Sequence, residues 1–197
     1  GCTQGFLKGG DSASIPVLCV FDSEEVGSVS PQGAGSSLLE DTLGRICDGL
    51  KLNRGRMLAQ SFLVSADNAH AIHPNHPEYA DPGNAPVMGG GLVIKYNANL
   101  SYCTDSVSAA VFRKICGRAG VKVQTYHNRA DLPGGSTLGR ISLAHVSVPT
   151  VDIGLAQLAM HSCYETAAVS DAIDLETAMA AYYGSTLEAT ESGFSIL

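Results

Sequence analysis

Residues 61–70 have the sequence SFLVSADNAH, in which a short apolar run from Ser61 to Ala66 ends abruptly in Asp67, Asn68 and His70. Apolar runs of this length that are bounded by polar turn residues are typical of buried strands. The sequence therefore predicts a strand that delivers a carboxylate and an imidazole to its carboxyl end.

The same strand pattern recurs on both sides of this segment and alternates with helical patterns. Strands are predicted at residues 15–21, 61–66, 92–96, 121–126 and 148–153, and helices at residues 36–50, 105–119, 136–144 and 171–183. An order of this kind favours parallel strands that are joined by crossover helices. We therefore predict an α/β fold with three αβα layers and a mostly parallel central sheet.

Composition excludes several classes of protein. The chain has 197 residues, of which 45% are hydrophobic and 16% charged, which is typical of a folded domain. A net charge of −7 without any Lys/Arg cluster argues against nucleic acid and anionic membrane surfaces as partners. No apolar run is long enough for a transmembrane helix, and no signal peptide is visible. The six cysteines form no CxxC pair, so we expect reduced thiols and a cytoplasmic protein.

Acidic and imidazole side chains follow three of the predicted strands. They are Glu24 and Glu25 after the first strand, Asp67 and His70 after the second, and His161 after the last. Because ligands bind at the carboxyl ends of parallel strands, these groups are expected to converge. One imidazole with two or three carboxylates suits Zn²⁺ or Mn²⁺, and a neighbouring carboxylate can act as a general base.

Each group also has a purely structural interpretation. Glu24 and Glu25 fit a solvated loop, Asp67 fits the cap of a turn, and a single histidine after a strand fits a core position. The residues alone leave these alternatives open.

Longer motifs around the same residues resemble those of the aspartyl aminopeptidase family, a family of M18-type metallopeptidases. The motifs are DSEEVGS at 22–28, SADNAHAIHPN at 65–75, GLVIK at 91–95, DLPGGSTLG at 131–139 and QLAMHS at 157–162. They occur in family order and extend over most of the chain. The resemblance implies a homo-oligomeric hydrolase that removes N-terminal Asp or Glu from peptides. It also implies two Zn²⁺ ions per complete site, with Mn²⁺ or Co²⁺ as substitutes.

The resemblance implies a role for each motif residue. Glu24 corresponds to the general base, Glu25 and His161 to ligands of one metal, and Asp67 to a ligand of the other. A water activated by the metals would attack the peptide carbonyl, and Glu24 would carry the proton to the leaving amine.

Three further residues match positions near the substrate. His70 and His73 are implied to shape the substrate site, and Lys95 to neutralise an acidic substrate side chain. Each of two residues has an alternative interpretation. His73, which precedes Pro74, could serve only to shape its loop, and Lys95 could be a solvated lysine at the end of a strand.

The chain departs from the family before Asp22. The resemblance implies a histidine ligand and a bridging aspartate upstream, yet no histidine precedes Glu24, and Asp11 lies in an unrelated Gly-Gly-Asp-Ser setting. We therefore expect an incomplete catalytic domain at residues 15–190, preceded by a cut segment or linker at 1–14 and followed by a tail at 191–197.

From these departures we expect weak or single-metal binding by the isolated chain, and the sequence leaves its own enzyme activity open. One alternative function is a metalloaminopeptidase with another side-chain preference. A second is a catalytically incomplete fragment that acts only as a folded or assembly domain.

Overall fold

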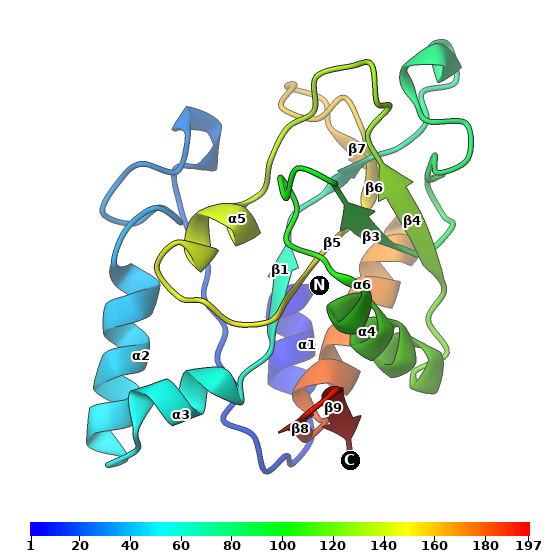
Figure 1. Cartoon of the computed structure of the whole chain (residues 1–197). Helices are drawn as coiled ribbons and strands as arrows, with labels where there is room; N and C mark the ends of the chain where they lie inside the picture. Colours follow the sequence, from blue (N-terminus) through cyan, green and yellow to red (C-terminus); the bar gives the residue numbers. More distant parts are fainter.

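A four-stranded sheet forms the centre of the computed structural model, which describes all residues 1–197 (Figure 1). The strands follow the order β1 (Leu63–Ala66), β5 (Thr150–Gly154), β3 (Leu92–Tyr96) and β4 (Val123–His127). β1 pairs with β5 and β3 with β4 in parallel, whereas β3 and β5 are antiparallel. The sheet is therefore mixed, and parallel pairing predominates in it, as the sequence predicts.

Helices cover both faces of this sheet. Alternate side chains of β3 and β5, among them Ile94 and Ile153, join one core cluster with α4 (Ser106–Arg118) and α6 (Val169–Tyr183). On the other face, α5 (Leu138–Leu143) lies directly on β1 and β5. Gly139 approaches so closely there that a Cβ atom would lie 2.7 Å from an Asp152 oxygen. The predicted three-layer αβα arrangement is confirmed.

A buried carboxylate connects α5 to the sheet. Asp152 is fully buried on β5 and accepts hydrogen bonds from Ser65 Oγ at 2.5 Å, Thr137 Oγ1 at 2.8 Å and the backbone N–H of Cys103. These donors satisfy a charge that would otherwise be very unfavourable inside the protein. They also secure the segment that contains the predicted DLPGGSTLG motif.

The remaining elements surround this core. They are α2 (Leu38–Gly49), α3 (Arg54–Ala59), the short helical turns η1 (Glu24–Val26) and η2 (Pro77–Tyr79), and a small sheet of β2 (Ala69–His70), β6 (Ala156–Leu158) and β7 (Thr166–Ala167). None of the helices combines the length and the apolar character that crossing a membrane requires.

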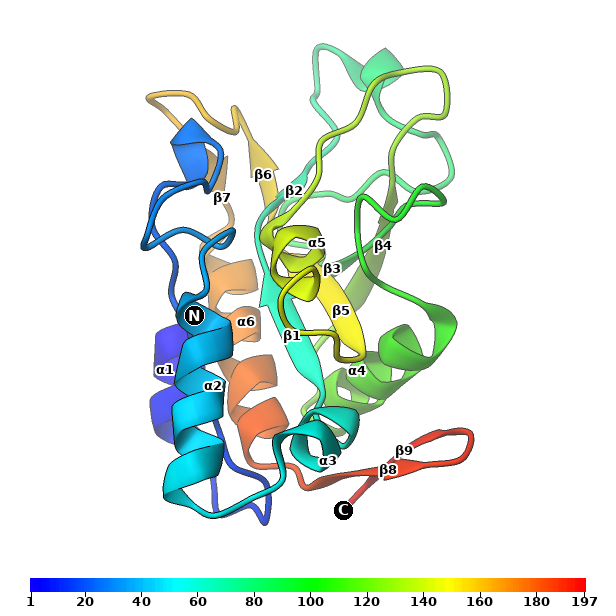
Figure 2. The same ribbon diagram turned by 60° about the vertical axis from the view of Figure 1, so that its left-hand side comes forward.

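Both ends of the chain have regular structure, which the sequence analysis missed. Helix α1 (Cys2–Lys8) lies along α6, where a Cβ on Gly5 would be only 2.4 Å from Met179 Cβ (Figure 2). Half of the expected linker at 1–14 is thus a packed helix. The expected tail at 191–197 contains β9 (Gly193–Ile196), which pairs with β8 (Leu187–Thr190). The domain boundaries themselves stay a prediction.

The predicted strand at residues 15–21 is wrong. This segment runs beside the sheet without helix or strand structure, and residues 17–21 donate no backbone–backbone hydrogen bond. Its apolar, β-forming composition favours a strand, but a strand also needs a hydrogen-bonded neighbour. No strand of this chain lies next to it.

Candidate metal centre

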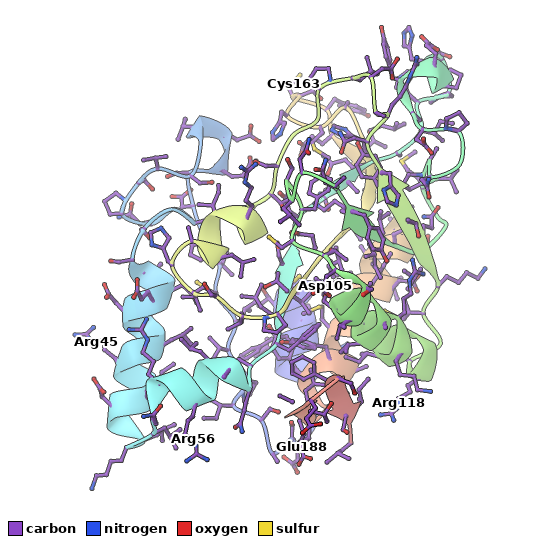
Figure 3. The ribbon with its side chains drawn as sticks, viewed as in Figure 1. Arg45, Arg56, Asp105, Arg118, Cys163 and Glu188 are labelled. Carbon is purple, nitrogen blue, oxygen red and sulfur yellow. The ribbon has the colours of Figure 1, made fainter.

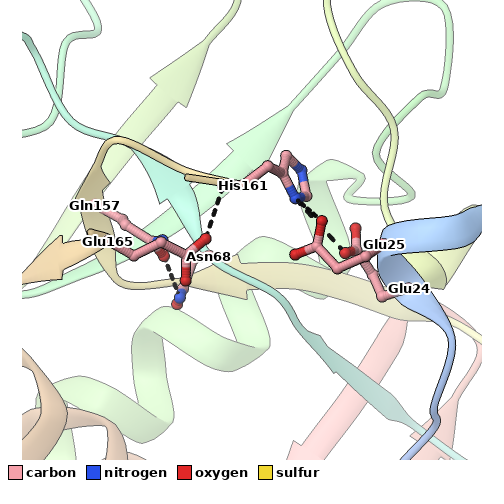
Figure 4. Close-up of polar contacts among 6 residues, drawn as sticks. All are labelled: Glu24, Glu25, Asn68, Gln157, His161 and Glu165. Carbon is pink, nitrogen blue, oxygen red and sulfur yellow. Dashed lines mark hydrogen bonds and ion pairs between the residues drawn. The ribbon is translucent and has the colours of Figure 1, made fainter. Parts of the chain in front are cut away.

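Three of the predicted site residues come together in space. Glu24 and Glu25 lie in η1, and His161 lies in the turn between β6 and β7 (Figure 4). His161 Nδ1 is 2.9 Å from Glu25 Oε2 and 3.7 Å from Glu24 Oε2. Their potential ligand atoms all lie within 4.8 Å of one another, and all three side chains are exposed. The fold thus gathers two carboxylates and an imidazole at one accessible point.

Both segments that form this cluster contain a residue with a left-handed backbone conformation. Ser23, which begins the η1 turn, has φ of 65°, and His161 has φ of 64°, both in the left-handed region. Such conformations cost a non-glycine residue about 1–2 kcal/mol. Local hydrogen bonds compensate, since Asp22 Oδ1 accepts from the Ser23 N–H at 2.7 Å. Glu165 Oε1 likewise accepts from the His161 N–H at 2.7 Å. Left-handed backbone therefore directs both segments toward the cluster.

The charges of the cluster influence one another. The hydrogen bond to Glu25, supported by the charge of Glu24, raises the pKa of His161 above its ordinary value. Desolvation raises the pKa of Glu24, and the carboxylates of Asp67, Glu25 and Glu165 add to this effect while His161 opposes it. The cluster is thus an acidic site that positive charge stabilises. A divalent cation fits it, since carboxylate and imidazole donors are those that Zn²⁺ prefers.

Asp67 lies near this cluster but outside the group of closest ligand atoms. Its backbone N–H donates to the Ile153 carbonyl at 3.0 Å, which extends the β1–β5 pairing to the start of the loop. Its charge contributes to the raised pKa of Glu24. The structure therefore places Asp67 as a neighbour of the cluster.

Lys95 is enclosed, with only 1% of the residue exposed. Its ammonium donates to the carbonyl oxygens of Asp67 at 2.9 Å and Asn68 at 3.1 Å, and it lies 5.2 Å from the ring centre of Tyr102. Burial lowers its pKa, while Asp67 and Asp152 oppose that shift. Lys95 thus supports the Asp67 turn, a contact that sequence reasoning missed although the lysine stands in an apolar run.

The two loop histidines have different surroundings. His70 lies on β2, with its ring 6.3 Å from that of Tyr126. Desolvation, followed by the charges of Lys95 and His161, lowers the pKa of His70. His73 is exposed, and its Nδ1 accepts from the Asn75 N–H at 3.2 Å. The structure thus connects His70 electrostatically to the cluster and shows only a local contact for His73.

Two supporting contacts were not predicted. Glu165 binds the backbone of His161, and Asn68 donates to Gln157 across the β2–β6 pair (Figure 4). No motif indicated Glu165, and its only sequence signal is an acidic residue four positions after His161. Cys163, two residues after His161, lies at the end of the molecule opposite Arg56 (Figure 3).

Two curated relatives are similar to most of this chain. A probable M18 family aminopeptidase 2 of Mycobacterium tuberculosis is 46% identical over 183 residues, which cover 90% of this chain and 42% of that protein. A probable aspartyl aminopeptidase of Ricinus communis is 45% identical over 165 residues, which cover 82% of this chain and 33% of that protein. The chain thus spans less than half the length of these relatives.

A solved structure and a family model agree with these similarities. The structure of the S. cerevisiae mApe1 dodecamer matches with a TM-score of 0.72 and 28% identity, over 83% of this chain and 36% of that chain. Residues 6–183 match the model of the aminopeptidase I zinc metalloprotease (M18) family. This match covers most of the chain, including Glu24, Glu25, Asp67 and His161. The chain belongs to the M18 family of aminopeptidases.

Proposed function

We propose that this chain carries the metal-binding part of a metalloaminopeptidase that removes N-terminal Asp or Glu from peptides. The observation that carries the proposal is the cluster of Glu24, Glu25 and His161, which joins segments 136 positions apart at one exposed point. A cluster assembled in this way, in a chain whose family is described as zinc metalloproteases, is best explained as a metal centre.

The residues suit a division of roles. Glu25 and His161 would hold one Zn²⁺, and Asp67 would contribute to a second. Zinc supplies a lowered pKa for a bound water and polarises a carbonyl group. Glu24 is the general base, because its raised pKa suits a carboxylate that takes a proton from the attacking water and returns it to the leaving amine.

Lys95 and the two histidines are the proposed substrate residues. Two of the three ammonium N–H groups of Lys95 donate to backbone carbonyls. Because the residue is only 1% exposed, the third can reach an acidic substrate side chain only if the neighbouring Asp67 turn moves aside. His70 favours the neutral imidazole through its lowered pKa, a form that donates to a carbonyl oxygen without adding charge. His73 is proposed to border the substrate from the exposed loop. The name of the Ricinus communis relative supports acidic specificity.

The working form is proposed to be a cytoplasmic homo-oligomer. The S. cerevisiae relative forms a dodecamer, and here Val26, Val29 and Tyr164 are strongly exposed apolar side chains around the metal centre. Six free cysteines are consistent with a reducing compartment.

One observation favours a second candidate. Asp67 stands outside the tight ligand cluster, so a chain that binds a single metal and lacks turnover, acting as a folded or assembly domain, also fits.

Chromophore release from an aspartyl and a leucyl substrate, with Zn²⁺, Mn²⁺ or Co²⁺ added, tests the proposal. The assay is run on the chain and on a chimera in which the chain replaces the matching part of the M. tuberculosis relative. Glu24→Gln should abolish metal-dependent aspartyl hydrolysis, whereas Glu191→Gln, in an exposed turn, should not. An inactive chimera whose fold is intact would exclude the enzymatic proposal, and a preference for the leucyl substrate would exclude acidic specificity.

A further inference from the structure

Asn68 connects the segment that carries Asp67 to the segment that carries His161. Its side-chain Nδ2 donates to Gln157 Oε1, and its Oδ1 accepts from the Leu155 N–H at 3.3 Å (Figure 4). Both partners lie more than 80 positions further along the chain. The contacts therefore cross from the loop after β1 to the place where β5 ends and β6 begins.

The backbone at this crossing is paired over a short length. β2 and β6 are parallel, and the Ala69 N–H donates to the Leu155 carbonyl at 2.8 Å. Because β2 has only 2 residues, few backbone hydrogen bonds hold the pair together. Asp67 precedes β2 by two residues, and His161 follows the end of β6 by three. The position of one proposed ligand relative to the other thus depends on a short junction that a side-chain contact can strengthen.

The lack of a side chain at Gly154 lets the two segments approach closely. A Cβ atom there would lie 2.0 Å from the carbonyl oxygen of Asp67 and 2.8 Å from Asn68 Cα. Both distances are far below van der Waals contact, and both neighbours are backbone atoms. The Lys95 ammonium donates to the same Asp67 carbonyl at 2.9 Å. Groups of β3, β5 and β6 therefore all fix the turn formed by Asp67 and Asn68.

Gln157 is suited to act as the fixed end of this contact. The residue is only 3% exposed, whereas Asn68 is at the surface. A buried amide that loses its hydrogen-bond partner is costly, because water cannot replace that partner. Loss of the Asn68 side chain would therefore favour a local rearrangement of β6, the strand that leads to His161.

We propose that Asn68 and Gln157 are positioning residues, which fix Asp67 relative to His161 and thereby set the spacing of two metal ions. The inference rests on the proposed function, in which Asp67 and His161 bind different ions. Two-metal hydrolases keep their ions about 3.5–4 Å apart, so a small shift between the two segments matters. Asn68 and Gln157 act through the backbone that they hold and do not contact the ions themselves.

Amide hydrogen exchange of the metal-free chain tests the contact. Asn68→Ala and Gln157→Ala should each speed exchange by about tenfold in peptides that cover β2 and β6, because the short pair loses its side-chain support. The double variant should exchange no faster, since both changes remove the same contact. Unchanged exchange of β3 and β4 verifies that each variant is folded. Asn53→Ala is the matched control, because it removes a side-chain hydrogen bond at the start of α3, remote from the β6–β7 turn (Figure 1).

Co²⁺ binding by the chimera tests the consequence for the metal centre. We expect two Co²⁺ ions per chain whose electron spins couple, as electron paramagnetic resonance would show. Asn68→Ala or Gln157→Ala should weaken binding of the second ion by about tenfold or more and reduce the coupling, whereas Asn53→Ala should change neither. A general loss of stability would not alter the coupling between two bound ions.

Several results would overturn the proposal. They are unchanged amide exchange in Asn68→Ala, additive effects of the two substitutions, and unchanged coupling between the Co²⁺ ions in either variant. A chimera that binds only one Co²⁺ before any substitution would instead contradict the two-metal proposal. Exchange of the metal-free chain would then decide by itself whether Asn68 and Gln157 hold the two segments together, so the two proposals fail in different measurements.

Discussion

The ammonium of Lys95 lies 2.9 Å from the carbonyl oxygen of Asp67, although the lysine is on the third strand of the sheet and the aspartate follows the first. A buried charge is tolerated only when polar partners surround it. Here the partners are the carbonyls of the turn that carries a proposed metal ligand. Lys95 is therefore a positioning residue for Asp67, whether or not it also contacts substrate.

Replacing Lys95 by methionine should destabilise the chain and disturb the Asp67 turn. The two carbonyl oxygens would lose charged donors inside the protein, at a cost of about 1.5–3 kcal/mol each at most. Urea unfolding measures the loss, and Lys114→Met, at an exposed position of α4, should change the free energy of unfolding little. In the chimera, an equal fall in aspartyl and leucyl hydrolysis would indicate positioning alone. A selective loss of aspartyl hydrolysis would indicate contact with the substrate.

The Asp152 carboxylate should be among the most important polar groups for stability. Asp152→Ala removes an acceptor that satisfies Ser65, Thr137 and the Cys103 N–H in the interior. Leaving buried donors without a partner costs about 1–3 kcal/mol for each group. We expect a loss of about 3 kcal/mol or more, measured by chemical unfolding. Asp48→Ala, at an exposed site of α2, is the control, and equal stability of the two variants would contradict this role.

Metal binding should strengthen as pH rises. The Glu25 contact raises the pKa of His161 above its ordinary value of 6.5, so in the metal-free chain the imidazole keeps its proton to a higher pH. A metal must displace that proton, and apparent Zn²⁺ affinity should therefore increase with pH through and above this value. Calorimetric titration at pH 6 and pH 8 measures the change. His161→Ala should remove most of the pH dependence, while His145→Ala, exposed and outside the cluster, should leave it intact.

The packing of α1 on α6 should be sensitive to a single methyl group. Gly5→Ala would place a Cβ 2.4 Å from Met179 Cβ, so the helices must separate. Overpacking of this kind costs about 1–3 kcal/mol. Gly44→Ala in α2 is the matched control, because a Cβ atom at this position meets nothing within 4 Å. This substitution should stabilise the chain by up to about 1 kcal/mol, since alanine has the higher helix propensity. Equal thermal melting temperatures for the two variants would show that α1 is not packed as described.

Local sequence patterns determined much of the fold. The strands β1, β3, β4 and β5 were predicted from short apolar runs, because strands of a sheet that is covered on both faces need apolar side chains on both sides. A helix was predicted at residues 105–119, and the Asp105 carboxylate caps α4 by accepting from the Ser108 N–H at 2.7 Å. The sequence also predicted that Glu24, Glu25 and His161 converge, and they do, although residues 15–21, which were expected to bring the two glutamates to the sheet edge, form no strand.

Tertiary structure decided what depends on a partner distant in the sequence. Residues 15–21 have the composition of a strand, yet pairing is a property of two segments, and these residues belong to none of the three sheets. The Cys2–Lys8 segment is short for an isolated helix, and only the surface of α6 explains its structure. The sequence shows a lysine at position 95 within an apolar strand, but only the fold directs its ammonium to the Asp67 carbonyl. Patterns along the chain determine which groups a segment buries, whereas hydrogen bonds between segments decide where those groups meet.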